Sequence, residues 1–561
     1  MNYFLTYTVY VLILSVLMGI STWKLFKKLG YSPLFAFIPF YNYFIILKET
    51  KHPKWWAILS YLPIVGPIMM SVFHLYLMKK FGKTLFKDQL LTVILPFIYM
   101  ATVNYSKDVE IEDENELYLT QEEKEAKKKD SFVGSITFAV VFATIIHTFI
   151  TQPFGIPTGS MERTLLVGDF LFVNKWSYGY RLPMRPVAIP FLQGTIYDFQ
   201  KDGNPKNDGK SYVEAVKLPY ERIFQFNKPQ KNDIVVFNYP RDSVHVSLDR
   251  ADPYVKRCVA VAGDTFEMRD GRMFVNGKPE TVLGDQDIQH AFYIEASSEI
   301  DVPTLYKRLG FISIAVLDTE KFLAIKNNEK YNINPKNIVY LMQLTNSRLN
   351  EIKSLPQVVS THEDIMDKGE GGISYRNAEK TKIDTTNSIF PINKGWNQDQ
   401  YGPLRIPKKG DVVAINQETL PEFQWIIKNY EHNTLENKNG KIFINGKETN
   451  QYTIKQDYYM MIGDNRDASL DARFFGFVPE ENIVGKPMFT WMSIEGAFTD
   501  SQSSYQADGW RIRWDRMFKA TNTGEANKTS YWWVAVMILV LFFGWEYFMK
   551  LFGKKKKDDE I

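Results

Sequence analysis

The chain has almost no cysteine, few histidines and little net charge, and each shortage excludes a class of protein. Cys258 is the one cysteine among 561 residues, so an intramolecular disulfide framework and a cysteine-based zinc site are both excluded. We expect Cys258 to be a small buried hydrophobic residue. The seven histidines are scattered without an HExxH or paired spacing, and the net charge is +3. We therefore expect no metal, no other cofactor and no nucleic-acid partner.

The N-terminal region lacks the features of a cleaved leader. No basic residue precedes its first apolar stretch and no small-x-small pattern follows, while lysines come after it. This pattern predicts an uncleaved helix whose C-terminal end faces the cytoplasm. Residues 53–80 and 88–105 are further membrane candidates, and the apolar segment 31–49 fits an interfacial or re-entrant segment equally well because of its prolines and Asn42. We expect 1–104 to be an α-helical membrane module with an open number of crossings.

The rest of the chain is too long for one ordinary domain and carries two further apolar spans. A charged linker, 105–130, ends in lysines and precedes an apolar span at 131–151; a second span at 530–550 leads into a basic tail, 551–561. Both are long enough to cross a bilayer core of about 30 Å. Because lysine clusters favour the cytoplasm, 152–529 should lie on the far side, tethered at both ends.

The sequence predicts that the tethered body, 152–529, is mainly β, because short β-branched or aromatic runs end repeatedly at Gly, Asn, Asp or Pro. We expect a β core built from 152–280 and 401–495, an inserted α/β cap at 281–400, and a membrane-proximal segment at 496–529.

Two pairs of segments within the body are similar to each other. Residues 229–238 match 407–416, and 271–280 match 440–449. A duplication explains these matches, and so do two unrelated strand-turn units that share hairpin chemistry. Both 271–280 and 440–449 contain an Asn-Gly pair, which predicts a tight hairpin turn.

Ser160, in "PFGIPTGSMERTLLVGD", is a candidate nucleophile that needs a base. The nearest histidine, His245, lies in a polar loop and is better explained as solvated. A lysine can serve if burial makes it neutral, since its ordinary pKa is about 10.4. Lys256 stands in the apolar run "YVKRCVAVAGD". Strand alternation puts Lys256 and Arg257 on opposite faces, so one can point inward while the other reaches solvent.

A third stretch, "GDNRDASLDARFFGFVP" at 463–479, predicts a turn held by its own side chains. Asp471 and Arg473 are expected to pair and lock it. Arg466 inside the run, and the lack of a closing glutamate, disfavour a calcium loop.

Together and in this order, the three stretches resemble those of bacterial type I signal peptidases, membrane-bound leader peptidases with a serine–lysine dyad. The match covers about Phe154–Val187, Asp233–Pro279 and Asp411–Gly485, with "SMxxTLxxGD", "DIVVF", "YVKRCVAVAGD" and "GDNRDxSxDxRxxGxVP" in family order. The N-terminal region with "IPFYN" resembles a module that some of these peptidases carry, without known chemistry.

The resemblance implies a role for each matching residue. Ser160 is the expected nucleophile and Lys256 the general base; Thr158 and the Ser160 backbone N–H form the oxyanion hole, and Ser469 orients the lysine. The expected substrate-binding residues are Phe154, Ile156, Met161, Leu165, Tyr254 and Val255. The expected structural supports are Asp464, Asn465, Arg466, Asp467, Asp471 and Arg473. The chain departs from the family at Arg163, where proline is common, and at Ala468, where asparagine is common.

The resemblance implies a serine endopeptidase of a bacterial cytoplasmic membrane, multi-pass, with its catalytic body on the extracytoplasmic side. Its partners would be secretory preproteins, the lipid bilayer and the export machinery, and cleavage would follow small residues in an Ala-x-Ala-like pattern. A catalytically inactive module that binds exported chains is the alternative, but it predicts a substitution at Ser160 or Lys256. A self-cleaving repressor-type serine–lysine protease is a further alternative, against which the flanking spans argue.

Overall fold

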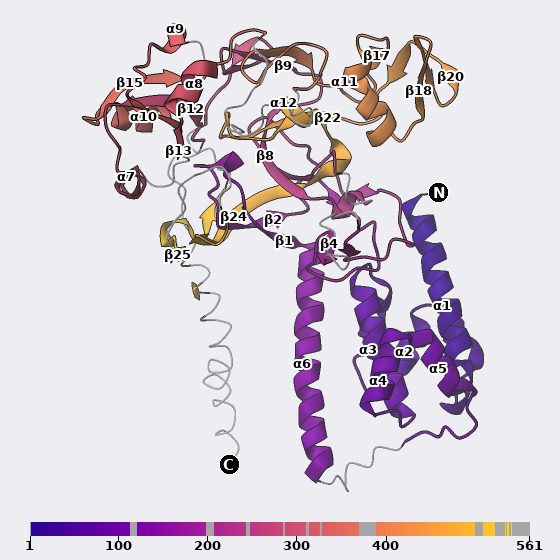
Figure 1. Cartoon of the computed structure of the whole chain (residues 1–561). Coiled ribbons are helices and arrows are strands. Elements are labelled where there is room, and N and C mark those ends of the chain that lie inside the picture. The colour runs from indigo at the N-terminus through magenta and orange to yellow at the C-terminus, as the bar shows by residue number, and fades with distance from the viewer. Residues whose placement is uncertain are drawn as a thin grey trace, which may run out of the picture. The chain divides into compact units, whose positions relative to one another are not determined.

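The structure, a computed structural model, divides into two compact units (Figure 1). The first comprises Met1–Gln152, Gly179–Gln225 and Asp242–Asp252, and the second comprises Pro153–Tyr178, Phe226–Arg241 and Pro253–Ile561. The described residues are 2–112, 121–197, 207–242, 247–283, 286–309, 314–325, 328–369, 389–499, 509–521, 533, 536–537 and 540.

The first unit contains two long helices, α1 (Tyr3–Lys28) and α6 (Gln121–Phe149). Within the described residues, only α1 is both long and apolar enough to cross a membrane, and Ser135–Phe149 of α6 is a shorter apolar stretch. Lys27 and Lys28 occupy the last turn of α1. Most of the expected span at 131–151 lies in α6, which begins earlier, in the charged segment that we expect to be a linker, and ends at Phe149.

Short helices replace the other two expected membrane segments of the N-terminal module. Pro96 lacks a backbone N–H and pushes Leu95 out of the helical region, to φ −128° and ψ 56°, so one helix ends there and the next begins. The elements of this region are η1 (Pro33–Phe37), α2 (Tyr41–Glu49), η2 (Lys54–Tyr61), α3 (Val65–Lys80), α4 (Phe86–Ile94) and α5 (Pro96–Tyr105).

A turn of the same kind occurs twice in this module. Phe40 joins η1 to α2 and Ile64 joins η2 to α3, with φ values of 62° and 68°. In each case the next N–H donates to the carbonyl of the preceding proline, at 2.7 Å and 2.8 Å. These are γ-turns with the rarer positive φ. They divide the apolar segments, which look continuous in the sequence, into short helices of a repeated design.

The remainder of the first unit is a helix-contacting lobe, defined here as Gly179–Gln225 and Asp242–Asp252. The Tyr3 hydroxyl donates to the Pro183 carbonyl at 3.0 Å, and the Tyr180 hydroxyl donates to the Thr148 carbonyl at 2.9 Å. The first turn of α1 and the last turn of α6 therefore meet the same lobe. We predicted 152–280 as one continuous part of the core, whereas this lobe packs with the helices. Its strands are β3 (Tyr180–Arg181), β4 (Thr195–Tyr197), β5 (Gly209–Lys210) and β6 (Arg222–Ile223).

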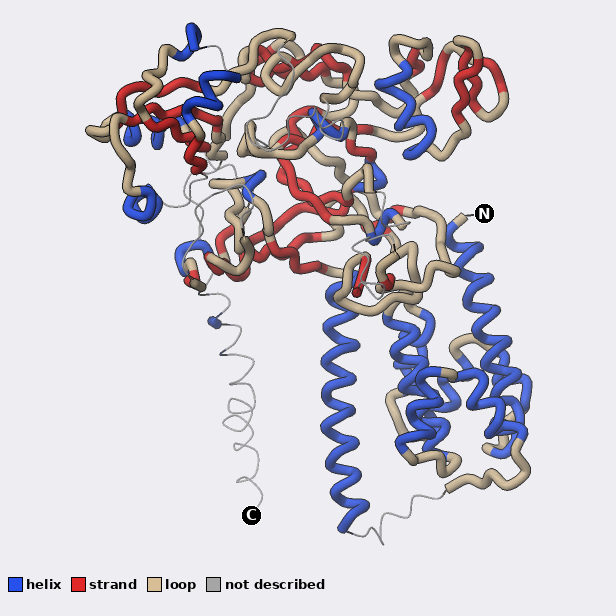
Figure 2. The backbone as a smooth tube through the Cα atoms, viewed as in Figure 1, coloured by secondary structure: helices blue, strands red, loops and turns tan. Residues whose placement is uncertain are grey.

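The second unit is mainly β (Figure 2) and is organised around one large antiparallel sheet. The 13-residue strand β24 pairs with β2 on one side and β7 on the other. In order, the sheet contains β1 (Thr151–Gly155), β2 (Asp169–Asn174), β24 (Ile483–Glu495), β7 (Ile234–Asn238), β8 (Pro253–Ala260), β22 (Tyr458–Ile462) and β23 (Val478–Pro479), with β25 (Arg511–Ile512) and β26 (Lys519–Ala520) also on β24.

Smaller sheets extend the core. The predicted Asn-Gly turns are confirmed, because Asn276–Gly277 and Asn445–Gly446 all have positive φ and close hairpins. Cys258 is buried, as expected. One sheet contains β11 (Lys278–Pro279), β10 (Arg272–Val275), β9 (Thr265–Arg269) and β16 (Tyr401–Arg405); others pair β17 (Val412–Ala414) with β21 (Gln451–Thr453), and join β18 (Leu435–Lys438), β19 (Lys441–Ile444) and β20 (Lys447–Glu448). Helices α11 (Leu420–Trp425) and η8 (Ile426–Tyr430) lie between β17 and β18 in sequence, and α12 (Ala472–Phe475) lies between β22 and β23 of the large sheet.

The segment that we expect to be an inserted cap contains a four-stranded sheet with helices between its strands in sequence. Alternate residues of β12 (His290–Ala296) face two apolar clusters. Phe292 and Ile294 pack with α7 (Val302–Leu309) and α10 (Asn346–Lys353), while Tyr293 packs with α8 (Thr319–Ile325) and α9 (Asn328–Tyr331). Its sheet runs β13 (Ile314–Leu317), β14 (Ile338–Leu344), β12 (His290–Ala296) and β15 (Val358–Glu363); its helices are α7 (Val302–Leu309), α8 (Thr319–Ile325), α9 (Asn328–Tyr331) and α10 (Asn346–Lys353).

The last predicted segments are only partly described. In the membrane-proximal segment, β25 and β26 pair with β24. The expected span at 530–550 and the tail at 551–561 lie outside the described residues, apart from four isolated positions.

Candidate functional site

Ser160 lies in a single helical turn that directly follows the first strand of the large sheet. The strand β1 leads to Ile156, whose N–H donates to the Asp169 carbonyl at 2.9 Å, and the chain then turns through η4 (Gly159–Met161). This turn keeps Ser160 largely buried, with 7% of the residue exposed. The serine is therefore held at the start of the sheet, in a site that excludes most water.

Lys256 reaches Ser160 from β8. Register with β7 places Lys256 opposite Val235, and its Nζ lies 2.5 Å from the Ser160 Oγ. Only 3% of Lys256 is exposed. Burial lowers the pKa of Lys256 to about 8, because the charged form loses its hydration; the carboxylates of Asp471 and Asp464 raise it and Arg473 lowers it further. Burial therefore shifts the pKa of Lys256 in the direction expected from the sequence for a general base.

Arg257 is buried as well, contrary to the expectation that one of the two basic residues reaches solvent. Its Nε and Nη2 donate to the two carboxylate oxygens of Asp464 at 2.8 Å and 2.6 Å, and Thr164 donates to the same carboxylate at 2.6 Å. Burial alone would raise the pKa of Asp464, but Arg257 holds it below its usual range. Strand alternation failed here because this end of β8 is buried on both faces.

Asn465 and Gly463 both contact the helical turn Gly159–Met161, which we call the serine turn. The Asn465 N–H donates to the Ser160 carbonyl at 3.2 Å, and its side-chain amide donates to the Gly159 carbonyl at 3.0 Å. Gly463 lies so close that a Cβ there would overlap the Ser160 carbonyl and the Ser469 side chain. The loop at 463–473 therefore contacts the backbone of the candidate nucleophile directly.

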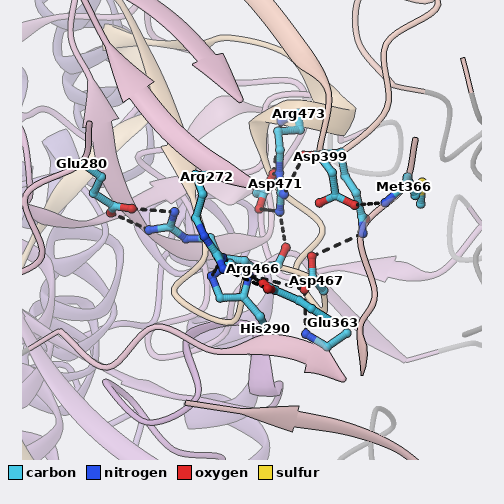
Figure 3. A network of polar contacts seen from close by, with 12 residues as sticks. Arg272, Glu280, His290, Glu363, Met366, Asp399, Arg466, Asp467, Asp471 and Arg473 are labelled. Atoms are coloured by element: carbon cyan, nitrogen blue, oxygen red, sulfur yellow. Dashed lines mark hydrogen bonds and ion pairs between the residues drawn. The ribbon is translucent and has the colours of Figure 1, made fainter. Parts of the chain in front are cut away.

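The predicted pair between Asp471 and Arg473 is present and fully buried. Arg473 Nε and Nη2 donate to the two oxygens of Asp471, each at 2.9 Å, and Nη2 also donates to the Arg466 carbonyl. Burial would lower the pKa of Arg473, but the Asp471 carboxylate raises it above its usual value. Figure 3 shows this pair beside Arg466, which forms a bidentate ion pair with Glu280 at 2.6 Å and 2.9 Å.

Ser469 and Thr158 make no contact in this structure that demonstrates the roles expected of them beside Ser160 and Lys256. The Ser469 hydroxyl is buried and accepts or donates no hydrogen bond in the described part of the chain, although it lies next to Gly463. Thr158 is exposed at the N-terminal edge of η4, and its side chain makes no capping bond. Their assignment to lysine orientation and to the oxyanion hole remains a prediction.

The expected substrate-binding residues divide into two groups. Phe154, Tyr254 and Val255 are partly exposed, and the Tyr254 ring centre lies 5.9 Å from the Lys256 Nζ. Ile156, Met161 and Leu165 pack in a small apolar cluster, in which Met161 and Leu165 are fully buried. In this structure Met161 and Leu165 support the wall of the site and present no side-chain surface to a peptide.

Arg163, one of the departures from the family pattern, has an unusual backbone. Its φ is +75°, and its Nε donates to Asp287 of the insertion at 3.0 Å. The other departure, Ala468, is buried, and its N–H donates to the Asn465 carbonyl at 3.2 Å.

His245, the other base considered, lies outside the described residues. No cluster of three or more candidate metal ligands occurs among the residues that the structure describes.

The residues that form this site lie within stretches of the chain that match a known protein family. A family model described as signal peptidase, peptidase S26, matches residues 129–334 and 401–492, and the chain belongs to this family. Residues 34–112 match a second family, DUF5684, whose function is unknown.

Curated relatives agree with this assignment. The chain is 26% identical over 359 residues to a signal peptidase I of Buchnera aphidicola from Schizaphis graminum, covering 64% of this chain and 73% of the relative. It is 25% identical over 398 residues to a signal peptidase I of Buchnera aphidicola from Acyrthosiphon pisum, covering 70% and 85%. The signal peptidase I of Haemophilus influenzae is 25% identical over 410 residues, covering 71% and 79%.

Sequence reasoning missed two features of the site. Arg257 was not assigned a role, although a charged residue inside an apolar run is itself a signal that a buried partner exists. The contacts between the insertion and the 463–473 loop had no sequence signal, because they depend largely on backbone groups.

Proposed function

We propose that this protein is a membrane-bound serine endopeptidase that removes signal peptides from exported preproteins on the extracytoplasmic side of a bacterial membrane. Ser160 is the nucleophile and Lys256 the general base. The observation that carries this proposal is the 2.5 Å separation of Lys256 Nζ and Ser160 Oγ in a buried site. Membership of the signal peptidase family supports the substrate class.

The pKa of Lys256 decides whether this pair can work near neutral pH. At pH 7.5, a lysine with a pKa of about 8 is neutral in roughly a quarter of molecules, whereas a pKa near 10.4 leaves about one molecule in a thousand neutral. Burial therefore increases the reactive fraction by more than about a hundredfold.

In the proposed reaction, neutral Lys256 takes the Ser160 proton as Oγ attacks the scissile carbonyl. The Ser160 N–H and the Thr158 hydroxyl stabilise the developing oxyanion. Lys256 then returns the proton to the leaving amine, which frees the mature protein and leaves the signal peptide as an ester on Ser160. Water deprotonated by Lys256 hydrolyses that ester and restores both residues.

The substrate would lie as an extended strand beside the partly exposed residues Phe154, Tyr254 and Val255. Main-chain hydrogen bonds bind any sequence in this way, so side-chain pockets must set specificity. We propose shallow apolar pockets that accept small side chains at the first and third positions before the cut, which is the Ala-x-Ala-like preference.

We propose that α1 and α6, together with the apolar segment at 530–550, anchor the protein as a multi-pass membrane protein. The shared contact of the first turn of α1 and the last turn of α6 with the helix-contacting lobe supports this orientation, as do Lys27 and Lys28 at the other end of α1. The N-terminal module would then meet the bilayer, and the export machinery is a candidate partner. Protease added to intact spheroplasts should digest the 152–529 body; a body protected until lysis would refute the orientation.

The test of activity uses the full-length protein purified in detergent and a preprotein with an Ala-x-Ala site. The wild-type protein should cut after the second alanine, as identified by mass spectrometry, and Ser160→Ala should not cut. An inactive module that only binds exported chains is the alternative; intact preprotein retained by the wild-type protein would favour it. The presence of both Ser160 and Lys256, in contact, argues against that alternative.

A further inference from the structure

Both ends of the insertion bond to the loop that holds the serine turn. At the leading end, the Gln289 N–H donates to the Asp464 carbonyl and the Arg466 N–H donates to the Gln289 carbonyl, each at 3.0 Å. These two bonds form a parallel β-bridge between Gln289 and Asn465. The insertion therefore adds a strand-like segment to this loop, and its first strand, β12, begins immediately afterwards.

Asp467 connects the two ends of the insertion. One of its carboxylate oxygens accepts from the Ala291 N–H at 2.7 Å, and the other accepts from the Gln398 side-chain amide at 3.3 Å. Figure 3 shows Asp467 among residues of the insertion and of the loop, near His290, Glu363 and Asp399. A single buried carboxylate thus fixes where the insertion leaves and rejoins the core.

Asn465 links the segment around Gln289 to the backbone of the candidate nucleophile, Ser160. The residues on both sides of it, Asp464 and Arg466, are bonded to Gln289, and Asn465 itself donates to the Gly159 and Ser160 carbonyls. A movement of Gln289 would therefore move Asn465 and, through it, the backbone that carries the Ser160 hydroxyl.

A second contact reaches the same turn from another direction. Arg163, three residues after Ser160, forms an ion pair with Asp287 at 3.0 Å. Asp287 lies two residues before Gln289, so one short segment of the insertion contacts Arg163 directly and reaches the Ser160 turn through the 463–473 loop. This contact also explains a departure of the sequence, since the arginine stands where the family commonly has proline.

We propose that the insertion is a positioning element of the active site, with Asp467 and the Arg163–Asp287 pair as its positioning residues. It acts by holding Asn465 and the Ser160 turn at the distance from Lys256 that proton transfer requires. A misplacement of about 1 Å in such a geometry costs on the order of a hundredfold in rate. The inference rests on the proposed function for its choice of assay, while the contacts themselves are independent of it.

The first experiment compares three variants of the full-length protein on the Ala-x-Ala preprotein. Asp467→Ala removes both acceptors and should lower kcat by about ten- to a hundredfold with little change in KM. Asp467→Asn keeps an acceptor for the Ala291 N–H and should recover most of the rate. Asp318→Ala is the matched control, because Asp318 is an exposed carboxylate of the insertion that accepts from the Lys321 N–H at 3.1 Å, away from the loop; its kcat should be unchanged.

Two further readouts separate positioning from general loss of structure. Thermal unfolding measures whether each variant is folded, and the pH profile of kcat should shift in Asp467→Ala if the surroundings of Lys256 change. A wild-type kcat in Asp467→Ala would overturn the proposal. An equal loss in Asp318→Ala would also overturn it, because any weakening of the insertion would then have the same effect.

If Asp467→Ala does not fold, the partly exposed Arg163–Asp287 pair provides the test of the proposal. Asp287→Arg and Arg163→Asp should each lower kcat by about 1.5- to 5-fold, the range of a partly exposed ion pair, and the double exchange should restore it. Absence of coupling in kcat would count against the proposal.

Failure of the proposed function is recognised separately with p-nitrophenyl N-acetylalaninate, an activated ester that needs no signal peptide. Acylation of Ser160, followed by intact mass, reports the reactivity of the serine in every variant. A wild-type protein that is acylated but cuts no preprotein would refute the substrate assignment, and the order of acylation rates among the variants would still test the positioning role.

Discussion

Arg257, next to the candidate base in sequence, forms a fully buried bidentate ion pair with Asp464, which is the residue that leads into Asn465. This pair joins β8 to the 463–473 loop, so the strand that carries Lys256 and the loop that holds Ser160 are fixed to each other. Breaking a buried pair on one side leaves an uncompensated charge, which costs about 3–5 kcal/mol.

Arg257→Met should therefore destabilise the protein by about 3–5 kcal/mol, measured as the free energy of unfolding at pH 7. The pKa of Asp464 lies below its unfolded value, so the stabilisation is present above about pH 4 and is lost as the pH falls through the folded pKa. Unfolding curves from pH 7 to pH 3 should show a shallower acid loss in Arg257→Met than in the wild-type protein. Equal acid profiles would show that this pair does not contribute.

Lys256→Arg should remove activity as completely as Ser160→Ala does, because guanidinium stays charged. Lys256→His should keep at most a trace, since its imidazole has a suitable pKa but a shorter reach. In the wild-type protein, activity should rise with pH along a single limb with a midpoint near the pKa of Lys256, about 8. Substantial cleavage of the same bond by Lys256→Arg would eliminate the dyad and return attention to His245.

Ser469→Ala should lower turnover while leaving measurable activity, if the serine orients Lys256 without transferring a proton. Its hydroxyl is buried beside Gly463, so the substitution removes little volume and folding should be retained. Steady-state cleavage on several preproteins tests this. Wild-type behaviour across all of them would remove Ser469 from the mechanism.

Gly463→Ala should abolish activity although Ser160 and Lys256 are both still present in the sequence. The added methyl group would overlap the Ser160 carbonyl and the Ser469 side chain, so the loop or the serine turn must move. Gly440→Ala is a useful comparison, because its surroundings are open and only its positive φ is strained. Cleavage rates and unfolding temperatures of both variants give the result; an active Gly463→Ala would mean that the loop can retreat without consequence.

Arg163→Pro, which restores the residue common in the family, should inactivate this protein. Proline holds φ near −65°, whereas Arg163 has φ +75°, so the turn after Ser160 would have to change. Arg163→Gly accepts the positive φ and should lose only the Asp287 contact. If the proline variant cleaves as well as the glycine variant, the backbone at this position is not required for activity.

The motifs that carry the proposed chemistry could be read from the sequence because they are local. A serine after an apolar span, a lysine in an apolar strand and an Asp/Arg-rich turn each have a physical reason at short range, and the structure brings all three together. The Asp471–Arg473 pair is of this kind, since its partners are two residues apart and share one turn. The two Asn-Gly hairpin turns follow for the same reason.

The sequence by itself determined which residues have the chemistry to act, and where apolar and β-rich segments lie. Tertiary structure alone decided that Arg257 is buried against Asp464, that Met161 and Leu165 lie in the core, and that Gly179–Gln225 packs with the N-terminal helices. It also decided that the insertion bonds, through Gln289, to the loop that holds the Ser160 turn. The physical reason is that these contacts join residues far apart in the chain, many through backbone N–H and carbonyl groups that every residue carries, so no local pattern of side chains encodes them.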